Sequence, residues 1–154
     1  MTQLAFRLVK PDRASTAFDG EGARRVGGRW NSPGTQMVYA AESLSLAQLE
    51  VLVHFGHHSA LRRYGVVIAE FSPELLRRIE ELYSLPTDWD ARPPIRVSQD
   101  LGDQWIREQR SAVLSVPTVI TPGERNFLFN PAHPDFAKIT LRPAADFQFD
   151  ARLG

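Results

Sequence analysis

Apolar residues in this sequence fall into short runs separated by glycine, proline and polar clusters, a spacing typical of strands and turns. Residues 3–9 have the mixed pattern of a first strand, and residues 64–71 are predicted to be a buried strand. Pro117 interrupts the run at 113–120, so this strand is expected at a sheet edge or with a bulge. Further strands are predicted at 35–40 and, one or two, within 139–149.

Three segments have helical patterns instead. Ser45 is predicted to begin a helix because the residues after it fit a capping box, and Gly56 is expected to end it. A short second helix is predicted after Ser72, with Pro73 at its first position. A third is predicted at residues 98–109. Strands outnumber helices, so the predicted fold class is α+β.

Length and composition favour one compact domain spanning residues 1–154. Eighteen basic residues balance eighteen acidic ones, which argues against a dedicated nucleic-acid binder. The absence of cysteine excludes disulfides, thiolate metal sites and a cysteine nucleophile. Charge comes too early at the N-terminus for a secretory signal, and no apolar run would span a bilayer. The expected compartment is the cytoplasm.

A glycine-rich stretch, residues 20–34, contains five glycines and Pro33 and is predicted to be a long functional loop. Glycines let the backbone approach a ligand closely, and Arg29 among them could grip a phosphate through two hydrogen bonds. Trp30 offers a flat surface beside it. The alternative is a tight surface turn with a solvated arginine, and the pattern is not a dinucleotide-binding fingerprint.

Glu50 is the most informative polar residue of the predicted first helix. With Ala47 and His54 it forms a narrow stripe on a helix that is otherwise apolar, with Leu46, Leu49, Leu52 and Val53 on one wide face. Such a carboxylate is expected to face a cleft or a buried partner, and a structural salt bridge is the alternative. An ionised carboxylate there could bind ribose hydroxyls and stabilise an oxocarbenium-like transition state.

Other candidates are weaker. Tyr39, at the end of its predicted strand, could stack on a planar base, although most such tyrosines are core residues. His54 and His58 are four residues apart, but Gly56 breaks the helix between them, so no metal site is expected. Asn130 lies in a rigid polar loop where turn chemistry is the alternative to ligand binding. The residues alone therefore indicate a cleft enzyme or a binder.

Short motifs along nearly the whole chain add a resemblance. They are Phe6-Arg7-Leu8; Gly22 with Gly27-Gly28-Arg29-Trp30-Asn31 and Gly34; Val38-Tyr39-Ala40; Ala47-Gln48-Leu49-Glu50; Leu85-Pro86 with Trp89; Gly102 with Trp105; Val116-Pro117-Thr118; and Asn126 with Asn130-Pro131 and His133-Pro134-Asp135-Phe136. In this order the set resembles the RES family, which is named for an arginine, a glutamate and a serine.

The resemblance implies a compact α+β fold similar to ADP-ribosyltransferases and an activity on NAD⁺, with no metal. Family members are toxins that degrade NAD⁺ by hydrolysis or phosphorolysis, or that transfer ADP-ribose to a protein. The family's arginine, tyrosine and glutamate correspond to Arg29, Tyr39 and Glu50, and Arg7 matches a further recurrent arginine. Arg29, with Arg7, is expected to hold the pyrophosphate, and Asn130 is included among the NAD⁺-binding candidates. A non-enzymatic interaction module that keeps the fold is the rival class.

This chain departs from the family at the serine, because Thr118 follows Val116-Pro117. Threonine keeps the hydroxyl but adds a methyl and stiffens χ1. Thr118 is therefore the expected hydroxyl-bearing residue of the site, with Ser111 and Ser115 as alternatives.

The resemblance also implies a partner, a small Xre-type antitoxin with a helix-turn-helix domain that covers the active site. Any DNA contact would belong to that partner, no membrane contact is expected, and a higher-order toxin–antitoxin oligomer is compatible with this picture.

Overall fold

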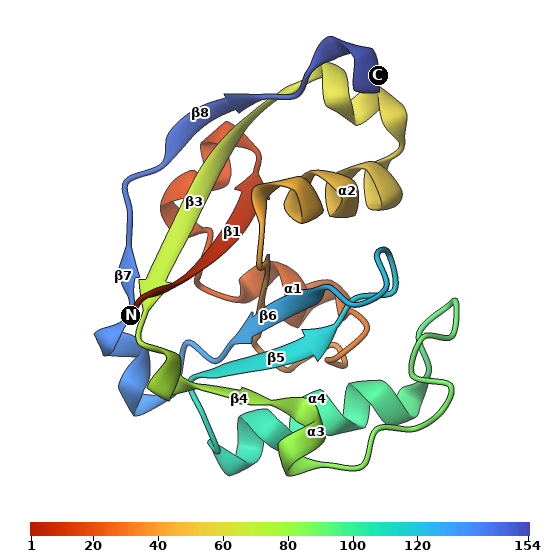
Figure 1. Cartoon of the computed structure of the whole chain (residues 1–154), viewed down its shortest axis with the longest axis vertical. Coiled ribbons are helices and arrows are strands. Elements are labelled where there is room, and N and C mark those ends of the chain that lie inside the picture. The colour runs from red at the N-terminus through yellow and green to blue at the C-terminus, as the bar shows by residue number, and fades with distance from the viewer.

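The computed structural model describes residues 1–154, and its eight strands form one sheet (Figure 1). The predicted α+β class is confirmed. The strands are β1 (Gln3–Val9), β2 (Val38–Ala41), β3 (Arg63–Phe71), β4 (Leu76–Arg78), β5 (Val113–Pro117), β6 (Arg125–Phe129), β7 (Thr140–Leu141) and β8 (Ala145–Gln148).

The sheet consists of two parts joined by a single pair of residues. Its order is β4-β5-β6-β2-β1-β3-β7, with β8 also on β3, and only β4 and β5 are parallel. Seven residue pairs join β1 to β3 and five join β5 to β6, but only Phe6 and Ala41 pair β1 with β2. The sheet therefore divides between β1 and β2, and the two parts diverge from there (Figure 1).

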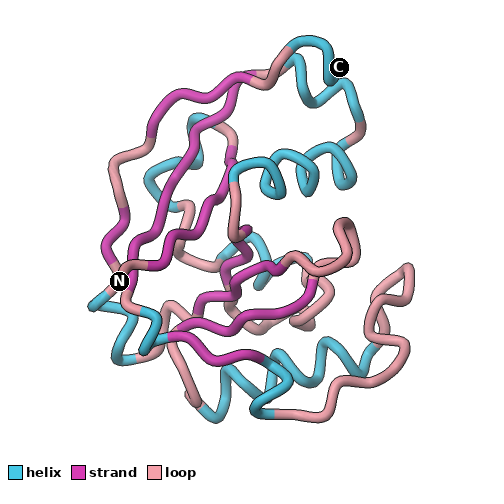
Figure 2. The backbone as a smooth tube through the Cα atoms, viewed as in Figure 1, coloured by secondary structure: helices cyan, strands magenta, loops and turns pink.

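Four α-helices and several short 3-10 turns connect the strands (Figure 2). The turns are η1 (Pro11–Thr16), η2 (His57–Leu61), η3 (Pro73–Leu75), η4 (Pro134–Lys138) and η5 (Ala151–Leu153). The helices are α1 (Glu21–Val26), α2 (Leu44–Phe55), α3 (Ile79–Leu82) and α4 (Arg96–Glu108). None of the helices has the length and apolar character that crossing a membrane requires.

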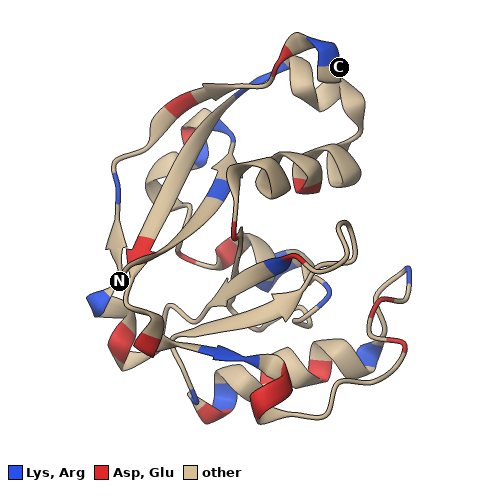
Figure 3. Ribbon diagram, in the orientation of Figure 1, with Lys and Arg blue, Asp and Glu red and all other residues tan.

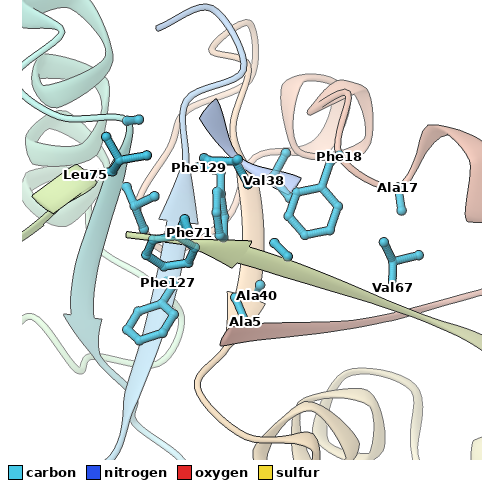
Figure 4. Close-up of a cluster of buried hydrophobic side chains, with 14 residues drawn as sticks. Ala5, Ala17, Phe18, Val38, Ala40, Val67, Phe71, Leu75, Phe127 and Phe129 are labelled. Carbon is cyan, nitrogen blue, oxygen red and sulfur yellow. The ribbon is translucent and has the colours of Figure 1, made fainter. Parts of the chain in front are cut away.

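Strand periodicity explains how the β5–β6 part is buried on both faces. Val113, Phe127 and Phe129 face a large cluster in which Phe71 and Phe129 meet edge to face, with ring centroids 5.6 Å apart (Figure 4). Leu114 and Leu128 face the opposite side, where α4 packs its fully buried Trp105. A strand buried on both faces shows no clean alternation of apolar and polar residues, which is the pattern of 113–120.

Several local predictions need correction. Ser43, not Ser45, caps α2, since its hydroxyl accepts a hydrogen bond from the Leu46 amide, but Gly56 ends the helix as predicted. The segment after Ser72 is a 3-10 turn, a strand and a one-turn helix rather than one helix. β5 is paired on both sides, and Pro117 is its last residue, so the prediction of an edge or a bulge was wrong. The glycine-rich stretch contains α1 and is not all loop.

Candidate active site

A cavity of about 710 Å³ lies where the two parts of the sheet divide. Its walls come from α2, from the segments that follow β5 and precede β6, and from the glycine-rich segment after α1. Five of the sequence-predicted residues line it together: Arg7, Arg29, Tyr39, Glu50 and Thr118. Asn130 does not line the cavity.

Glu50 is held in the cavity by side chains from three elements. Asn126 of β6 donates its Nδ2 hydrogen to Glu50 Oε1 at 2.7 Å. The Thr118 hydroxyl, just after β5, donates to the same oxygen at 3.3 Å. His54, one turn further along α2, places its Nε2 3.6 Å from Glu50 Oε2. The carboxylate is thus partly buried, with donors directed at both of its oxygens.

These contacts set the protonation state of Glu50. Burial raises the pKa of the carboxyl, but hydrogen bonds and charge from His54, together with hydrogen bonds from Asn126 and Thr118, outweigh it, so the pKa lies below its ordinary value. The same carboxylate raises the pKa of His54 above 6.5. Glu50 is therefore an anion at neutral pH.

Glu50 faces the cavity, as the sequence predicts, but the predicted apolar face of α2 is only partly buried. The helix buries Leu46, Ala47 and Val51, whereas Leu49 and Val53 of the predicted wide face are 40% and 64% exposed. The buried side includes Ala47 of the Glu50 stripe because α2 packs over β1 and β2, whose residues also line the cavity.

Thr118, the hydroxyl-bearing residue that the sequence predicts for the site, lies beside Glu50. Its side chain is buried, and its hydroxyl both donates to Glu50 and accepts a hydrogen bond from the Ile120 amide at 3.1 Å. Ser111 instead accepts a hydrogen bond from the Trp105 indole, and Ser115 accepts one from Arg125. Neither serine lines the cavity.

Tyr39 fixes the glycine-rich loop through its hydroxyl. The hydroxyl donates to Asn31 Oδ1 at 2.7 Å and accepts from the Trp30 amide at 2.9 Å. A Cβ on Gly28 would lie 2.7 Å from this hydroxyl, so the close approach requires a glycine. Burial strongly raises the pKa of the Tyr39 phenol. The hydroxyl therefore stays protonated and keeps its two hydrogen bonds, and Tyr39 lines the cavity.

Helix α4 holds the backbone on either side of Arg29. Ser98 donates its hydroxyl hydrogen to the Arg29 carbonyl at 2.8 Å, and Gln99 donates to the Gly28 carbonyl at 3.0 Å. Gly102 permits the contact, because a Cβ there would lie 1.6 Å from the Trp30 carbonyl oxygen. Gly102 is therefore the point where α4 contacts the glycine-rich loop.

The Arg29 side chain crosses to the segment between α3 and α4. Its Nη1 donates to the carbonyls of Trp89 and Ala91, at 3.0 and 2.8 Å. The indoles of Trp30 and Trp89 stack beside it, with centroids 6.1 Å apart and planes inclined by 19°. Arg29 therefore positions the 83–95 loop as well as lining the cavity.

The Arg7 side chain mainly connects backbone segments. Its Nε donates to the Ala17 carbonyl and its Nη1 to the Tyr39 carbonyl, each at 2.8 Å. Burial lowers the pKa of this guanidinium, opposed by the charge of Asp19. Arg7 thus ties β1 to β2 and η1, with Nη2 as the part that no protein carbonyl occupies.

The remaining candidates lie elsewhere. The Asn130 side chain accepts a hydrogen bond from the Ala132 amide at 3.0 Å, which is the turn chemistry considered as its alternative. His57 and His58 lie in η2, outside the cavity lining. No cluster of three or more histidine, aspartate or glutamate side chains is placed to hold a metal ion.

Sequence reasoning missed Asn126 and Arg92 as parts of the cavity wall. Asn126 stands within a motif of the resemblance, but neither its type nor its spacing indicated a contact with Glu50. Arg92 lies in a proline-rich loop without periodicity. Only the tertiary structure brings these residues to the cavity.

The structure combines a divided mixed sheet with a cavity at the division that is lined by both apolar and charged side chains. The structure superposes with a TM-score of 0.72 on a chain of the M. tuberculosis MbcT–MbcA toxin–antitoxin complex, covering 96% of this chain and 85% of that one at 19% identity. The RES domain family model matches residues 4–150, and the chain belongs to the RES family.

Two curated relatives match almost end to end. The "Prs ADP-ribosylating toxin" of Sphingobium sp. (strain YBL2) is 44% identical, and the match covers 99% of this chain and 98% of the relative. "Toxin Res" of Photorhabdus laumondii subsp. laumondii is 37% identical, with 97% and 96% covered. The resemblance drawn from short motifs is thereby confirmed.

Proposed function

We propose that this protein is the toxin of a toxin–antitoxin pair and an enzyme that cleaves the nicotinamide–ribose bond of NAD⁺. The observation that carries the proposal is the Glu50 carboxylate, kept ionised by Asn126, Thr118 and His54 in a cavity that Arg29 also lines. The names of the relatives and the family match support the toxin class.

The proposed chemistry uses the charges of the cavity. When the glycosidic bond breaks, its electron pair leaves with the nicotinamide nitrogen, and positive charge develops on the ribose. Glu50 binds the ribose hydroxyls and offsets that charge. Arg29 binds a phosphate oxygen, and the Tyr39 ring packs against the nicotinamide end. Thr118 holds Glu50 in position, and its hydroxyl orients the acceptor.

The acceptor decides the reaction. Water gives hydrolysis, phosphate gives phosphorolysis, and a protein side chain gives ADP-ribosylation; in each case the acceptor loses a proton as its new bond to the ribose forms. Hydrolysis or phosphorolysis would deplete cellular NAD⁺. Transfer to a protein is the second candidate, and the Sphingobium relative, 44% identical and named for ADP-ribosylating Prs, specifically favours it.

One experiment separates these reactions. Purified protein is incubated with NAD⁺ alone, with phosphate, and with Prs, and the products are separated by chromatography and mass spectrometry. Free ADP-ribose, its 1″-phosphate or modified Prs identifies the acceptor. Unchanged NAD⁺ in every arm, with no protein labelled in a lysate, would overturn the enzymatic proposal and leave the interaction module. Arg29→Ala in a folded protein should abolish toxicity if ligand binding underlies it.

We also propose that a cognate antitoxin covers the cavity, as the complex formed by the structural relative suggests. The antitoxin would be of Xre type with a helix-turn-helix domain, would carry any DNA contact, and would meet the toxin in the cytoplasm. Co-expression with the neighbouring reading frame, followed by affinity capture and light scattering, tests the complex and its stoichiometry. Failure of the two chains to associate would exclude this partner.

A further inference from the structure

Positive charge is concentrated at the cavity although the chain as a whole is neutral. The formal net charge is zero, and Figure 3 shows basic and acidic residues interspersed over both parts of the molecule. The cavity lining, however, contains three arginines and one carboxylate: Arg7, Arg29, Arg92 and Glu50. Glu50 already interacts with His54, Asn126 and Thr118. The cavity is therefore built to attract an anion.

Two of these guanidiniums have no acidic partner. Neither Arg29 nor Arg92 forms a salt bridge with any carboxylate. Burial lowers the pKa of Arg29 and the charge of Arg92 lowers it further, whereas the charges of Asp90 and Glu50 oppose this shift without forming a salt bridge. Two like charges that no carboxylate contacts directly favour an anion that binds to both.

Arg29 and Arg92 both keep N–H donors that no protein group accepts. An arginine carries five N–H donors. Arg29 uses Nη1 for the carbonyls of Trp89 and Ala91, which leaves Nε and Nη2 without a protein acceptor. Arg92 makes one long hydrogen bond, 3.3 Å from Nη2 to the Val119 carbonyl in the loop between β5 and β6. By contrast, Arg7 uses both Nε and Nη1 on backbone carbonyls.

The position of Arg92 is fixed by Arg29 itself. The carbonyl of Ala91, directly before Arg92, accepts a hydrogen bond from Arg29, and the Trp30–Trp89 stack holds the same loop. The loop between α3 and α4 lies beside the loop between β5 and β6 (Figure 1), where Arg92 meets Val119. Arg29 thus holds the loop that carries a second guanidinium lining the same cavity.

We propose that Arg92 is the second arginine of a diphosphate-binding site, in which Arg29 and Arg92 each bind one phosphate of a diphosphate-bridged dinucleotide. The inference rests on the proposed function and assigns to Arg92 the supporting role expected for Arg7. Planar guanidiniums bind phosphate oxygens through paired hydrogen bonds, and two neighbouring guanidiniums match two linked phosphates. Arg92 is a binding residue that acts equally on substrate and product.

The test compares Arg92→Gln with Arg96→Gln, an exposed arginine four residues further on that does not line the cavity. ADP-ribose, which keeps the diphosphate, is the probe for isothermal titration calorimetry. We expect Arg92→Gln to weaken ADP-ribose binding roughly 10- to 100-fold, the range for losing hydrogen bonds between charged groups. Arg92→Lys should lie in between, and Arg96→Gln should match the wild type.

Steady-state kinetics supplies a second readout. Arg92→Gln should raise KM for NAD⁺ by a similar factor and leave kcat within about threefold, since it removes uniform binding. Wild-type affinity of Arg92→Gln for ADP-ribose, or a wild type that does not bind ADP-ribose, would overturn the proposal.

The same measurements distinguish failure of the diphosphate site from failure of the proposed function. If the wild type binds ADP-ribose through Arg92 but never cleaves NAD⁺, the diphosphate site stands and the proposed function fails. If the wild type cleaves NAD⁺ and Arg92→Gln leaves both KM and the ADP-ribose affinity unchanged, the proposed function stands and the diphosphate site fails.

Discussion

The two walls of the cavity are held together in different ways. At the Glu50 wall, side chains from β6 and the end of β5 hold a side chain of α2. At the Arg29 wall, side chains form hydrogen bonds with backbone carbonyls. Ser98 donates to a carbonyl of the glycine-rich loop, and Arg29 donates to two carbonyls of the 83–95 loop. The contacts at the Glu50 wall set the ionisation of one carboxylate, whereas the contacts at the Arg29 wall set the course of two loops.

This difference indicates what each wall can tolerate. A change at the Glu50 wall alters the ionisation and direction of one carboxylate while the strands beneath it keep their pairing. A change at the Arg29 wall displaces backbone, so it moves a whole loop together with what that loop carries. Substitutions should therefore affect chemistry at the first wall and stability or ligand affinity at the second.

The largest effect is expected for Glu50→Gln. The substitution keeps the shape but removes the charge that is proposed to stabilise the developing cation, so kcat for NAD⁺ consumption should fall roughly 100- to 1000-fold. Turnover is measured at saturating NAD⁺, and thermal unfolding serves as the control for the fold. Near-normal turnover would remove Glu50 from this role.

Gly102→Ala should affect the other wall almost as strongly, but through stability. The new Cβ would lie 1.6 Å from the Trp30 carbonyl oxygen, so α4 must move away from the loop. A loss of about 3 kcal/mol in unfolding free energy is expected in denaturant titrations. Gly22→Ala is the matched control, because a Cβ there meets nothing within 4 Å and alanine should stabilise α1 by up to about 1 kcal/mol. Equal effects of the two substitutions would contradict the proposed contact.

A smaller effect is expected at Thr118. Thr118→Val removes the hydroxyl that donates to Glu50 but keeps the shape, and should lower turnover roughly 3- to 10-fold, the value of one hydrogen bond. Thr118→Ser restores the family residue and should retain activity close to the wild type. If valine matched serine, the hydroxyl would have no part in the site.

The smallest effect concerns pH. Glu50 raises the pKa of His54 above 6.5, so the imidazolium stabilises the folded state below that pH, and the contribution is lost as pH rises through the raised pKa. Since the His54 side chain is largely exposed, the change should be about 0.3–0.5 kcal/mol. Denaturant titrations of wild type and His54→Gln from pH 6 to pH 9 measure it, and parallel pH profiles would exclude it.

Sequence reasoning reached the Glu50 wall more directly than the Arg29 wall. The polar stripe on α2 follows from helical periodicity, so Glu50 could be selected from spacing alone. Arg29 depended on the family resemblance, because its position is fixed by α4, some 70 residues further on, through contacts such as Ser98 to the Arg29 carbonyl. Strands β1 and β3 matched their predicted ranges closely. Strand β4 was not predicted, because its three residues show no strand pattern and become extended by pairing with β5.

The single Phe6–Ala41 pair gives the protein a mechanical property. Between β1 and β2 the sheet has only this one residue pair, and both of its residues line the cavity. Helix α2 and the Arg7 side chain are further links between the two strands. Twisting one part of the sheet against the other would disturb few backbone hydrogen bonds between β1 and β2. Bending either part would instead strain a ladder of seven or five residue pairs. Backbone pairing within the sheet is thus weakest beside the cavity, and a ligand that contacts both walls would add a link across the division.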